Sequence, residues 1–351
     1  ESVSAQPDVP VGNLPPKNPY GSTFLNQVAV LLRRHSNLAI RDPSLYLGRA
    51  AMFLITCSFF SVIYWQARQR TQEQAFYRLW LLLWYIGVPS SLGVIAVFAL
   101  NIEFHAVKSE IRTGMFSPVA YLIAQGALQI PMMIFLGVCA VSVSGYGLSQ
   151  FNGENYVQFL LTYSLVMWVF ECQAQQLSVQ FNNPLLGTLG FLQNWFAAFL
   201  FGGIMIPTDD VIWPFRILTY ISPIRWGLTS LTKIEYSGTT FSGAELVASP
   251  IAGESPYYCP DLPNFACLGH TGDQVLASLG QNYKVISDED QLVKDSFILL
   301  AIAVGFKLLF MVDFTFKTKE MRAPSAPKSK NKVHVTGENV VAVTNANSGR
   351  P

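Results

Sequence analysis

The residues best suited to recognising a partner lie in a short charged segment, 103–114, between two long apolar runs. Four charges in ten residues cost too much free energy to lie in hydrocarbon. We therefore expect the segment to lie outside a membrane, where the chain turns between two spans and can dock another protein. Its charged residues and its closing glycine are Glu103, Lys108, Glu110, Arg112 and Gly114.

Two further ionisable residues, Glu171 and Lys307, lie inside apolar runs. Ionisable groups in a membrane usually face a bundle interior or a water-filled cavity and serve a function. Glu171 is followed by Gln173, Gln175 and Gln176, and such residues also serve simply as hydrogen-bonded contacts between helices. The long stem of Lys307 allows its ammonium group to reach the membrane surface. Both the functional and the structural interpretations remain open.

The sequence contains no motif typical of an enzyme or of a nucleotide site. It has no G-x-x-x-x-G-K-[ST] loop, no H-E-x-x-H and no G-x-S-x-G, and its four histidines are scattered. Cys259 and Cys267 can close a short disulfide if their loop faces an oxidising compartment. A metal site is the weaker alternative, because His270 is the only further ligand nearby and a closed zinc site needs four. We expect no metal, no catalytic residue and no cofactor in this chain.

The composition indicates a membrane protein. Of 351 residues, 51% are hydrophobic and 13% are charged, and the mean hydropathy is +0.33. Soluble domains carry about 25% charged residues. A net charge of +1 gives no basic face for nucleic acid.

The elements that position these residues can be read from hydrophobic periodicity. Residues 1–21 are rich in Pro, Ser and Asn and are predicted to form a linker. Residues 22–42 are predicted to form an amphipathic helix lying in the membrane interface, with a soluble packing helix as the alternative. Residues 43–316 are predicted to form six transmembrane helices, because six apolar runs approach the 20 residues that span a bilayer. These runs are Leu45–Trp65, Leu79–Leu100, Val119–Val143, Tyr156–Val179, Leu185–Ile206 and Phe297–Phe316.

Residues 207–295 form a connection too long to be idle. Its aromatic part, 213–234, is predicted to dip back into the membrane, and 250–280 to form a small external subdomain. Residues 317–351 are predicted to be a disordered cytoplasmic tail. Most basic residues flank the predicted spans on the side of the termini, which favours cytoplasmic termini. Arg68, Arg70 and Arg78 in the first opposite loop argue against that orientation.

Several segments, in this order and spacing, resemble the membrane domain of the ABCG (white-type) subfamily of ATP-binding-cassette exporters, also called the ABC-2 type. The likeness covers 22–316, with Asp42 where the family usually has Asn. The segments that carry it are Arg41–Arg49, the pattern Glu103, Glu110, Gly114, Ser117, Tyr121 and Pro131, Phe201–Pro207, Tyr220–Gly238 with Trp213 before it, and Cys259–Gly280.

The resemblance implies roles for individual residues. Residues 24–40 would be a connecting helix that touches the nucleotide-binding domain, and 103–114 the coupling helix. Cys259 and Cys267 would form a disulfide in the external loop, and Ile204 and Met205 an external plug. A substrate cavity would be lined by Val88, Ser91, Leu92, Ile95, Trp195, Phe196 and Phe199.

The resemblance also implies partners and a mechanism. ATP and Mg would bind on an associated nucleotide-binding domain, upstream in the same polypeptide or on a separate subunit. Two such half-transporters would form a homo- or heterodimer in the plasma membrane and export lipids, sterols or other hydrophobic compounds by alternating access. The alternatives are a stand-alone permease subunit with a separate ATPase, and a channel, scramblase or ion-coupled carrier that needs no ATP.

Overall fold

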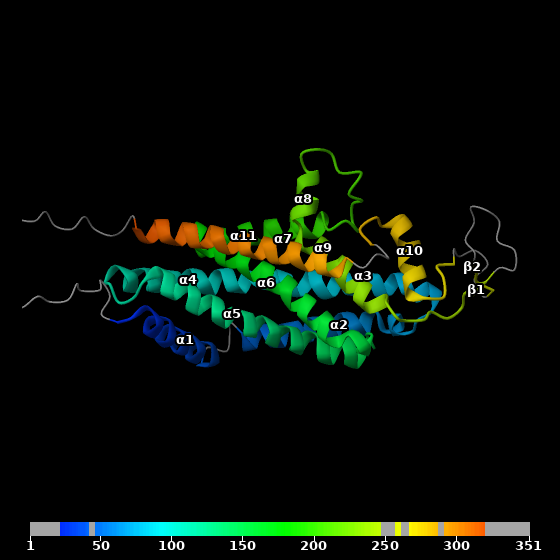
Figure 1. Ribbon diagram of the computed structural model, residues 1–351, viewed down its shortest axis with the longest axis horizontal. Helices are drawn as coiled ribbons and strands as arrows, with labels where there is room; N and C mark the ends of the chain where they lie inside the picture. Colours follow the sequence, from blue (N-terminus) through cyan, green and yellow to red (C-terminus); the bar gives the residue numbers. More distant parts are fainter. Residues whose placement is uncertain (1–21, 42–45, 247–256, 261–266, 287–290, 320–351) are drawn as a thin grey trace, which may run out of the picture.

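The computed structural model describes residues 22–41, 46–246, 257–260, 267–286 and 291–319. The described residues form an elongated helical bundle (Figure 1). Among them, this confirms the all-α prediction apart from one hairpin with two residues in each strand, β1 (Glu245–Leu246) and β2 (Tyr257–Tyr258). The predicted linker and nearly all of the predicted tail lie outside the described residues, as does part of the predicted external subdomain.

Within the described part of the chain, four helical segments are long and apolar enough to cross a membrane: Gln72–Arg112, Pro118–Leu148, Gly153–Gln180 and Leu292–Thr318. The first consists of α3 (Gln72–Ser91) and α4 (Gly93–Arg112), and the second of α5 (Pro118–Ala140) and the π-helix η2 (Val141–Leu148). The third contains η3 (Gly153–Asn155) and α6 (Tyr156–Gln180), and the fourth lies in α11 (Leu292–Lys319). These segments contain the predicted runs 79–100, 119–143, 156–179 and 297–316.

The other two predicted spans form shorter helices. The helices α2 (Leu47–Ile63) and α7 (Pro184–Leu200) each have 17 residues, about 26 Å of helix against a core of about 30 Å. The helix α7 ends before a turn in which Gly203 has φ of +90°, a conformation that glycine adopts without steric cost. The sixfold span count therefore stays a prediction.

The two ends of the bundle differ in what lies there (Figure 1). At one end, the loop end, α9 (Pro223–Tyr236) leads to the hairpin and α10 (Gly272–Asn282), and the 3₁₀ turn η1 (Trp65–Arg68) follows α2. At the other, the α1 end, α1 (Phe24–Arg41) packs along α5 near the last turns of α4 and α11. The short α8 (Arg216–Ile221) comes between α7 and α9 in the chain and projects from the bundle (Figure 1).

The predicted charged segment is not a separate helix. Residues 103–112 continue α4 without a break, and the chain turns only afterwards. The turn is a Schellman motif, because Met115 N–H bonds to the Glu110 carbonyl and Gly114 N–H to the Ile111 carbonyl. Gly114 takes φ of +77° there. Ser117 then caps α5 by accepting a bond from Ala120 N–H, so the charged end of α4 is held at the surface by backbone geometry.

Candidate functional site

A bidentate ion pair joins α1 to the charged end of α4. Both terminal nitrogens of Arg34 donate to the carboxylate of Glu110, each at 2.7 Å. The side chain of Arg34 is 49% exposed and that of Glu110 is 21% exposed. The Glu110 hydrogen bond raises the pKa of Arg34. The two segments for which the sequence predicts connecting and coupling roles are therefore in direct contact within one chain.

A second, more buried set of contacts adds α5 to the same junction. Nδ1 of His35 lies 3.2 Å from Oε1 of Glu103, and the Tyr121 hydroxyl donates to that same oxygen at 3.1 Å. The rings of His35 and Tyr121 pack edge to face, 5.4 Å apart. The amide oxygen of Gln27 accepts from Ser117 N–H at 2.9 Å. Residues from α1, α4 and α5 thus converge, so α1 is bound to both α4 and α5.

The remaining residues of the predicted coupling segment lie at its surface. The Lys108 ammonium group lies 5.8 Å from the centre of the Phe104 ring, while Arg112 is exposed beside the turn at Gly114. An exposed cation at the end of a helix is free to meet an acidic surface on another protein. Contact of this segment with a nucleotide-binding domain stays a prediction.

The predicted cavity residues of α7 pack directly on α3. Nε1 of Trp195 donates to the Gly87 carbonyl at 3.0 Å and to Ser90 Oγ at 2.9 Å. A Cβ atom at Gly87 would lie 2.6 Å from the Phe199 ring, so glycine is what allows this close approach. Trp195 and Phe199 therefore fill the space between the two helices and tie α7 to α3.

The other predicted cavity residues remain accessible. Phe196 points outward and is 58% exposed. The side chains on α3, α4 and their junction are half-buried, and these are Val88, Ser91, Leu92 and Ile95. Apolar and weakly polar side chains of this kind can bind hydrophobic molecules. Their role in substrate binding stays a prediction.

The predicted plug residues differ in burial. Ile204 is buried at 6% exposure, whereas Met205 is 37% exposed. A Cβ atom at Gly203 would lie 2.0 Å from Cγ2 of Val285, so the turn after α7 packs tightly against the segment that follows α10. In the next part of the turn, Asp209 forms ion pairs with Arg216, at 2.7 Å, and with Lys284.

The intramembrane Glu171 forms a buried ion pair with Arg49 of α2 at 2.8 Å, and both side chains are at most 3% exposed. Lys307 donates to Oε1 of Gln175, so the two ionisable groups found from sequence each have a partner on another helix. Sequence reasoning did not pair Arg49 with Glu171. The available signal was an arginine close to the start of the first apolar run.

A larger buried network at the loop end was missed entirely. Arg78 of α3 and Glu235 of α9 are each 1% exposed and lie 2.6 Å apart. Arg78 also donates to the Ala67 carbonyl at 2.7 Å and the Gln150 carbonyl at 2.6 Å. The second oxygen of Glu235 accepts from Asn152 N–H at 2.8 Å. This pair joins η1, α3, α9 and the segment after η2.

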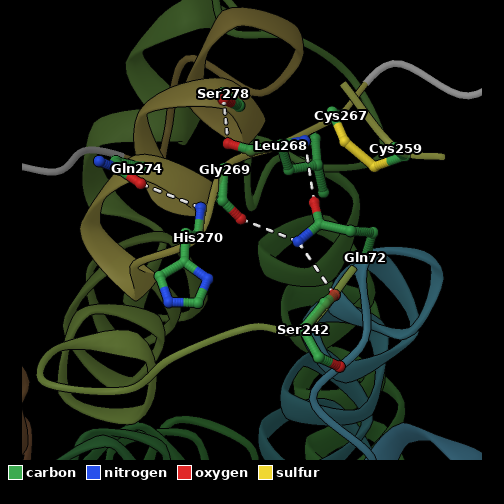
Figure 2. The surroundings of a disulfide bond; sticks show 9 residues. All are labelled: Gln72, Ser242, Cys259, Cys267, Leu268, Gly269, His270, Gln274 and Ser278. Carbon is green, nitrogen blue, oxygen red and sulfur yellow. Dashed lines mark hydrogen bonds between the residues drawn. A yellow bond between two sulfur atoms is a disulfide. The ribbon is translucent and has the colours of Figure 1, made fainter. Parts of the chain in front are cut away.

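Cys259 and Cys267 are joined by a disulfide in a loop that is bound to the start of α3 (Figure 2). The buried amide of Gln72 accepts from Leu268 N–H at 3.0 Å and donates to the Gly269 carbonyl at 2.8 Å. The same amide reaches the Ser242 carbonyl at 3.4 Å. The disulfide therefore belongs to a loop that is fixed to the bundle.

Comparison with known proteins places this geometry in context. A family model described as "ABC-2 type transporter" matches residues 26–236. ABC transporter G family member 37 of Arabidopsis thaliana is 23% identical over 239 residues, which cover 66% of this chain and 16% of that protein. ABC transporter asL7 of Sarocladium schorii is 23% identical over 342 residues, which cover 91% of this chain and 22% of that protein. Brefeldin A resistance protein of Schizosaccharomyces pombe is 23% identical over 237 residues, covering 66% and 15%. The chain thus spans a fifth or less of the length of most of these relatives.

Proposed function

The chain belongs to the ABC-2 type transporter family, and we propose that it is the membrane domain of an ATP-driven exporter of ABCG type. An ABC-2 membrane domain implies an associated nucleotide-binding domain, and several apolar helices indicate an integral membrane protein. The observation that carries the proposal is the Arg34–Glu110 ion pair. It joins an amphipathic helix to the charged end of a 41-residue span, an arrangement suited to passing a movement from a partner domain into the membrane.

In the proposed mechanism, the partner domain acts on this junction of α1 and α4, and the face formed by α3 and α7 changes in response. ATP and Mg would act on the partner domain, whose closure would push on α1 and on 103–114. Because only Leu92 separates α4 from α3, a displacement at Glu110 would reach the Trp195 contacts on α3 along these two successive helices. A change there would alter the accessible surface around Phe196 and Ser91, the proposed substrate site.

The proposed cargo is a lipid, a sterol or another hydrophobic compound, which the apolar character of that surface supports. One relative is named for resistance to brefeldin A, and this adds small toxic compounds to the candidates. The working unit would be a homo- or heterodimer with six spans per chain, in the plasma membrane with cytoplasmic termini. A stand-alone permease subunit with a separate ATPase would use the same junction.

An ion-coupled carrier or a channel that needs no ATP is the remaining alternative. It would require an ionisable group able to exchange a proton or ion within the membrane. Glu171 is the residue considered for that role, but Arg49 already neutralises it at 2.8 Å. Buried ion pairs of this kind commonly have a structural role, and loss of one partner leaves an uncompensated charge.

The test is reconstitution of the full-length protein in liposomes. ATP hydrolysis and uptake of a fluorescent lipid or sterol into inside-out vesicles are measured together, with and without ATP and Mg. We expect uptake that requires ATP and is lost when the catalytic carboxylate of the nucleotide-binding domain is neutralised. Equal uptake without ATP would reject the exporter proposal in favour of a channel, scramblase or carrier.

A further inference from the structure

A cavity of about 300 Å³ lies between α1, α4 and α5, next to the Arg34–Glu110 pair. Its wall is mostly apolar and includes Leu38, Ala39, Leu100, Ile102 and Leu128. The volume is at the lower limit of pockets that hold small ligands. A cavity with an apolar wall is a poor site for water unless polar groups line part of it.

Two polar atoms in that lining lack partners. His35 Nε2 and Gln125 Oε1 have no hydrogen-bond partner among the residues that the structure describes, and both side chains line the cavity. His35 is 6% exposed and Gln125 is 8% exposed. A buried polar group without a partner is unfavourable, and native structures rarely leave one unpaired. The pair therefore points to a bound group that is absent from the protein alone.

The protonation state of His35 defines what that group must offer. Nδ1 lies 3.2 Å from the Glu103 carboxylate, and in a neutral imidazole this nitrogen would carry the proton and leave Nε2 as an acceptor. Burial, followed by the nearby charge of Arg34, lowers the pKa of His35 and so favours the neutral ring. The amide oxygen of Gln125 is also an acceptor. Both unpartnered atoms are then acceptors, and each can take a hydrogen bond from a donor group on a bound molecule.

The opening of the cavity shows from where its occupant would come. Leu38 is 49% exposed and Ile102 is 56% exposed, and the exposed Ala106 lies beside them in the lining. Apolar side chains at the opening favour entry of a molecule with an apolar body from the lipid phase. The polar atoms lie on the inner side, where they would meet one small donor group.

We propose that this cavity binds the hydroxyl end of a lipid alcohol, with the hydroxyl group donating to Gln125 Oε1 beside His35 and the apolar body extending past Leu38 and Ile102. A sterol and a diacylglycerol both carry this chemistry. The occupant would touch α1 and α4 beside the Arg34–Glu110 pair, and would thereby favour the arrangement in which α1 is docked. Binding here is separate from the proposed transport surface on α3 and α7.

The test is photolabelling of the full-length protein in phosphatidylcholine nanodiscs. The probes are a cholesterol and a diacylglycerol that each carry a diazirine on the apolar body, and labelled peptides are identified by mass spectrometry. We expect label in 35–41 of α1 and in 122–129 of α5, displaced by the unlabelled form of the same lipid. If only one of the two probes is displaced by its unlabelled lipid, that lipid is the preferred alcohol.

Two variants test the polar and the steric parts of the proposal. Gln125→Leu should weaken binding by about tenfold, the cost of one lost hydrogen bond in a buried site. Ala106→Phe should block the opening at an exposed position that tolerates the larger side chain. The control is Gln129→Leu, which removes another buried amide, 2% exposed, one turn along the same helix but outside the cavity. This change also removes the acceptor of the Trp168 indole N–H, so it is the more disruptive of the two substitutions for packing.

The outcomes separate the proposal from a cavity that holds only water. Labelling that falls in Gln125→Leu and Ala106→Phe but persists in Gln129→Leu supports a lipid alcohol site. The proposal would be overturned if neither probe labelled these peptides. It would also be overturned if Gln125→Leu and the unaltered protein were labelled equally. Equal loss in Gln125→Leu and Gln129→Leu would overturn it too, because the loss would not be specific to the cavity. None of these results depends on transport activity.

Discussion

The Arg34–Glu110 pair makes a quantitative prediction about coupling. Its two hydrogen bonds at 2.7 Å involve charged partners, and bonds of this kind contribute roughly 1.5–3 kcal/mol when shielded from water. Arg34 is half exposed, and exposed pairs contribute only about 0.2–1 kcal/mol. Because this pair is bidentate and Glu110 is mostly covered, we expect about 1 kcal/mol. That value corresponds to roughly a fivefold change in the docking equilibrium of α1 on α4.

The experiment is a double-mutant cycle on substrate-stimulated ATP hydrolysis by the full-length protein. Arg34→Ala and Glu110→Ala should each reduce the stimulated rate roughly fivefold, and the double variant should lose little more, because either change removes the same bond. The swap Arg34→Glu with Glu110→Arg should recover most of the rate. Lys108→Ala is the matched surface control and should have a smaller effect.

A different result would identify a different role for Glu110. If Glu110→Ala abolished stimulation while Arg34→Ala had no effect, Glu110 would act directly on the partner domain, as the sequence resemblance alone implies. Additive losses in the double variant would equally refute the reasoning, since two residues that act only through each other cannot give independent effects. Basal hydrolysis and the elution volume of each variant show whether it is folded.

Three further predictions concern stability and the buried charges. Arg78→Met should lower the midpoint of thermal unfolding in detergent by several degrees, because it leaves the buried Glu235 with only the longer Arg70 contact at 3.4 Å, and loss of one partner of a buried pair costs up to about 3–5 kcal/mol. An unchanged midpoint would show that Arg70 or water replaces Arg78. Glu171→Gln should lower the midpoint of thermal unfolding, because it leaves Arg49 without its carboxylate partner, yet transport per folded molecule should stay within about twofold of that of the unaltered protein. Lost transport at an unchanged midpoint would instead assign Glu171 an ion-binding role. Cys267→Ser should destabilise the external loop by about 2–3 kcal/mol in a loop-closure model, which would be measured as faster amide exchange in the segment after Cys267. Unchanged exchange would show that the hydrogen bonds of Gln72 are sufficient to hold the loop.

The long spans were predictable from sequence because their signal is local. The runs 79–100, 119–143, 156–179 and 297–316 contain enough apolar residues for any helix there to prefer lipid. The lengths of α2 and α7 were overestimated. An apolar run can extend past the end of a helix, so its length overestimates the helix. The helix α7 ends at Leu200, before the turn at Gly203, while the apolar run continues to Ile206.

The pairing of charges that lie far apart in the chain could not be predicted from one sequence. Arg34 and Glu110 are 76 positions apart, Arg49 and Glu171 are 122 apart. Local patterns indicate that each charge needs a partner, but the choice depends on which helices pack together. Glu110 shows the consequence, since its charge was noticed and its contact with α1 was not. The cavity beside Gln125 likewise arises only from three packed helices.

The buried Arg78–Glu235 network also bears on how the bundle can open. At the loop end, several segments share one carboxylate that is 1% exposed, while at the α1 end the principal ion pair is half in water. Separating the helices at the loop end would break the pairs that Glu235 forms with Arg78 and Arg70, whereas separating them at the α1 end would break a pair already in contact with solvent. We expect the loop end to act as the fixed pivot of a lever, with the helices diverging at the α1 end. Because the segment Gln72–Arg112 is 41 residues long, a tilt of a few degrees at that pivot would displace Glu110 by several ångströms.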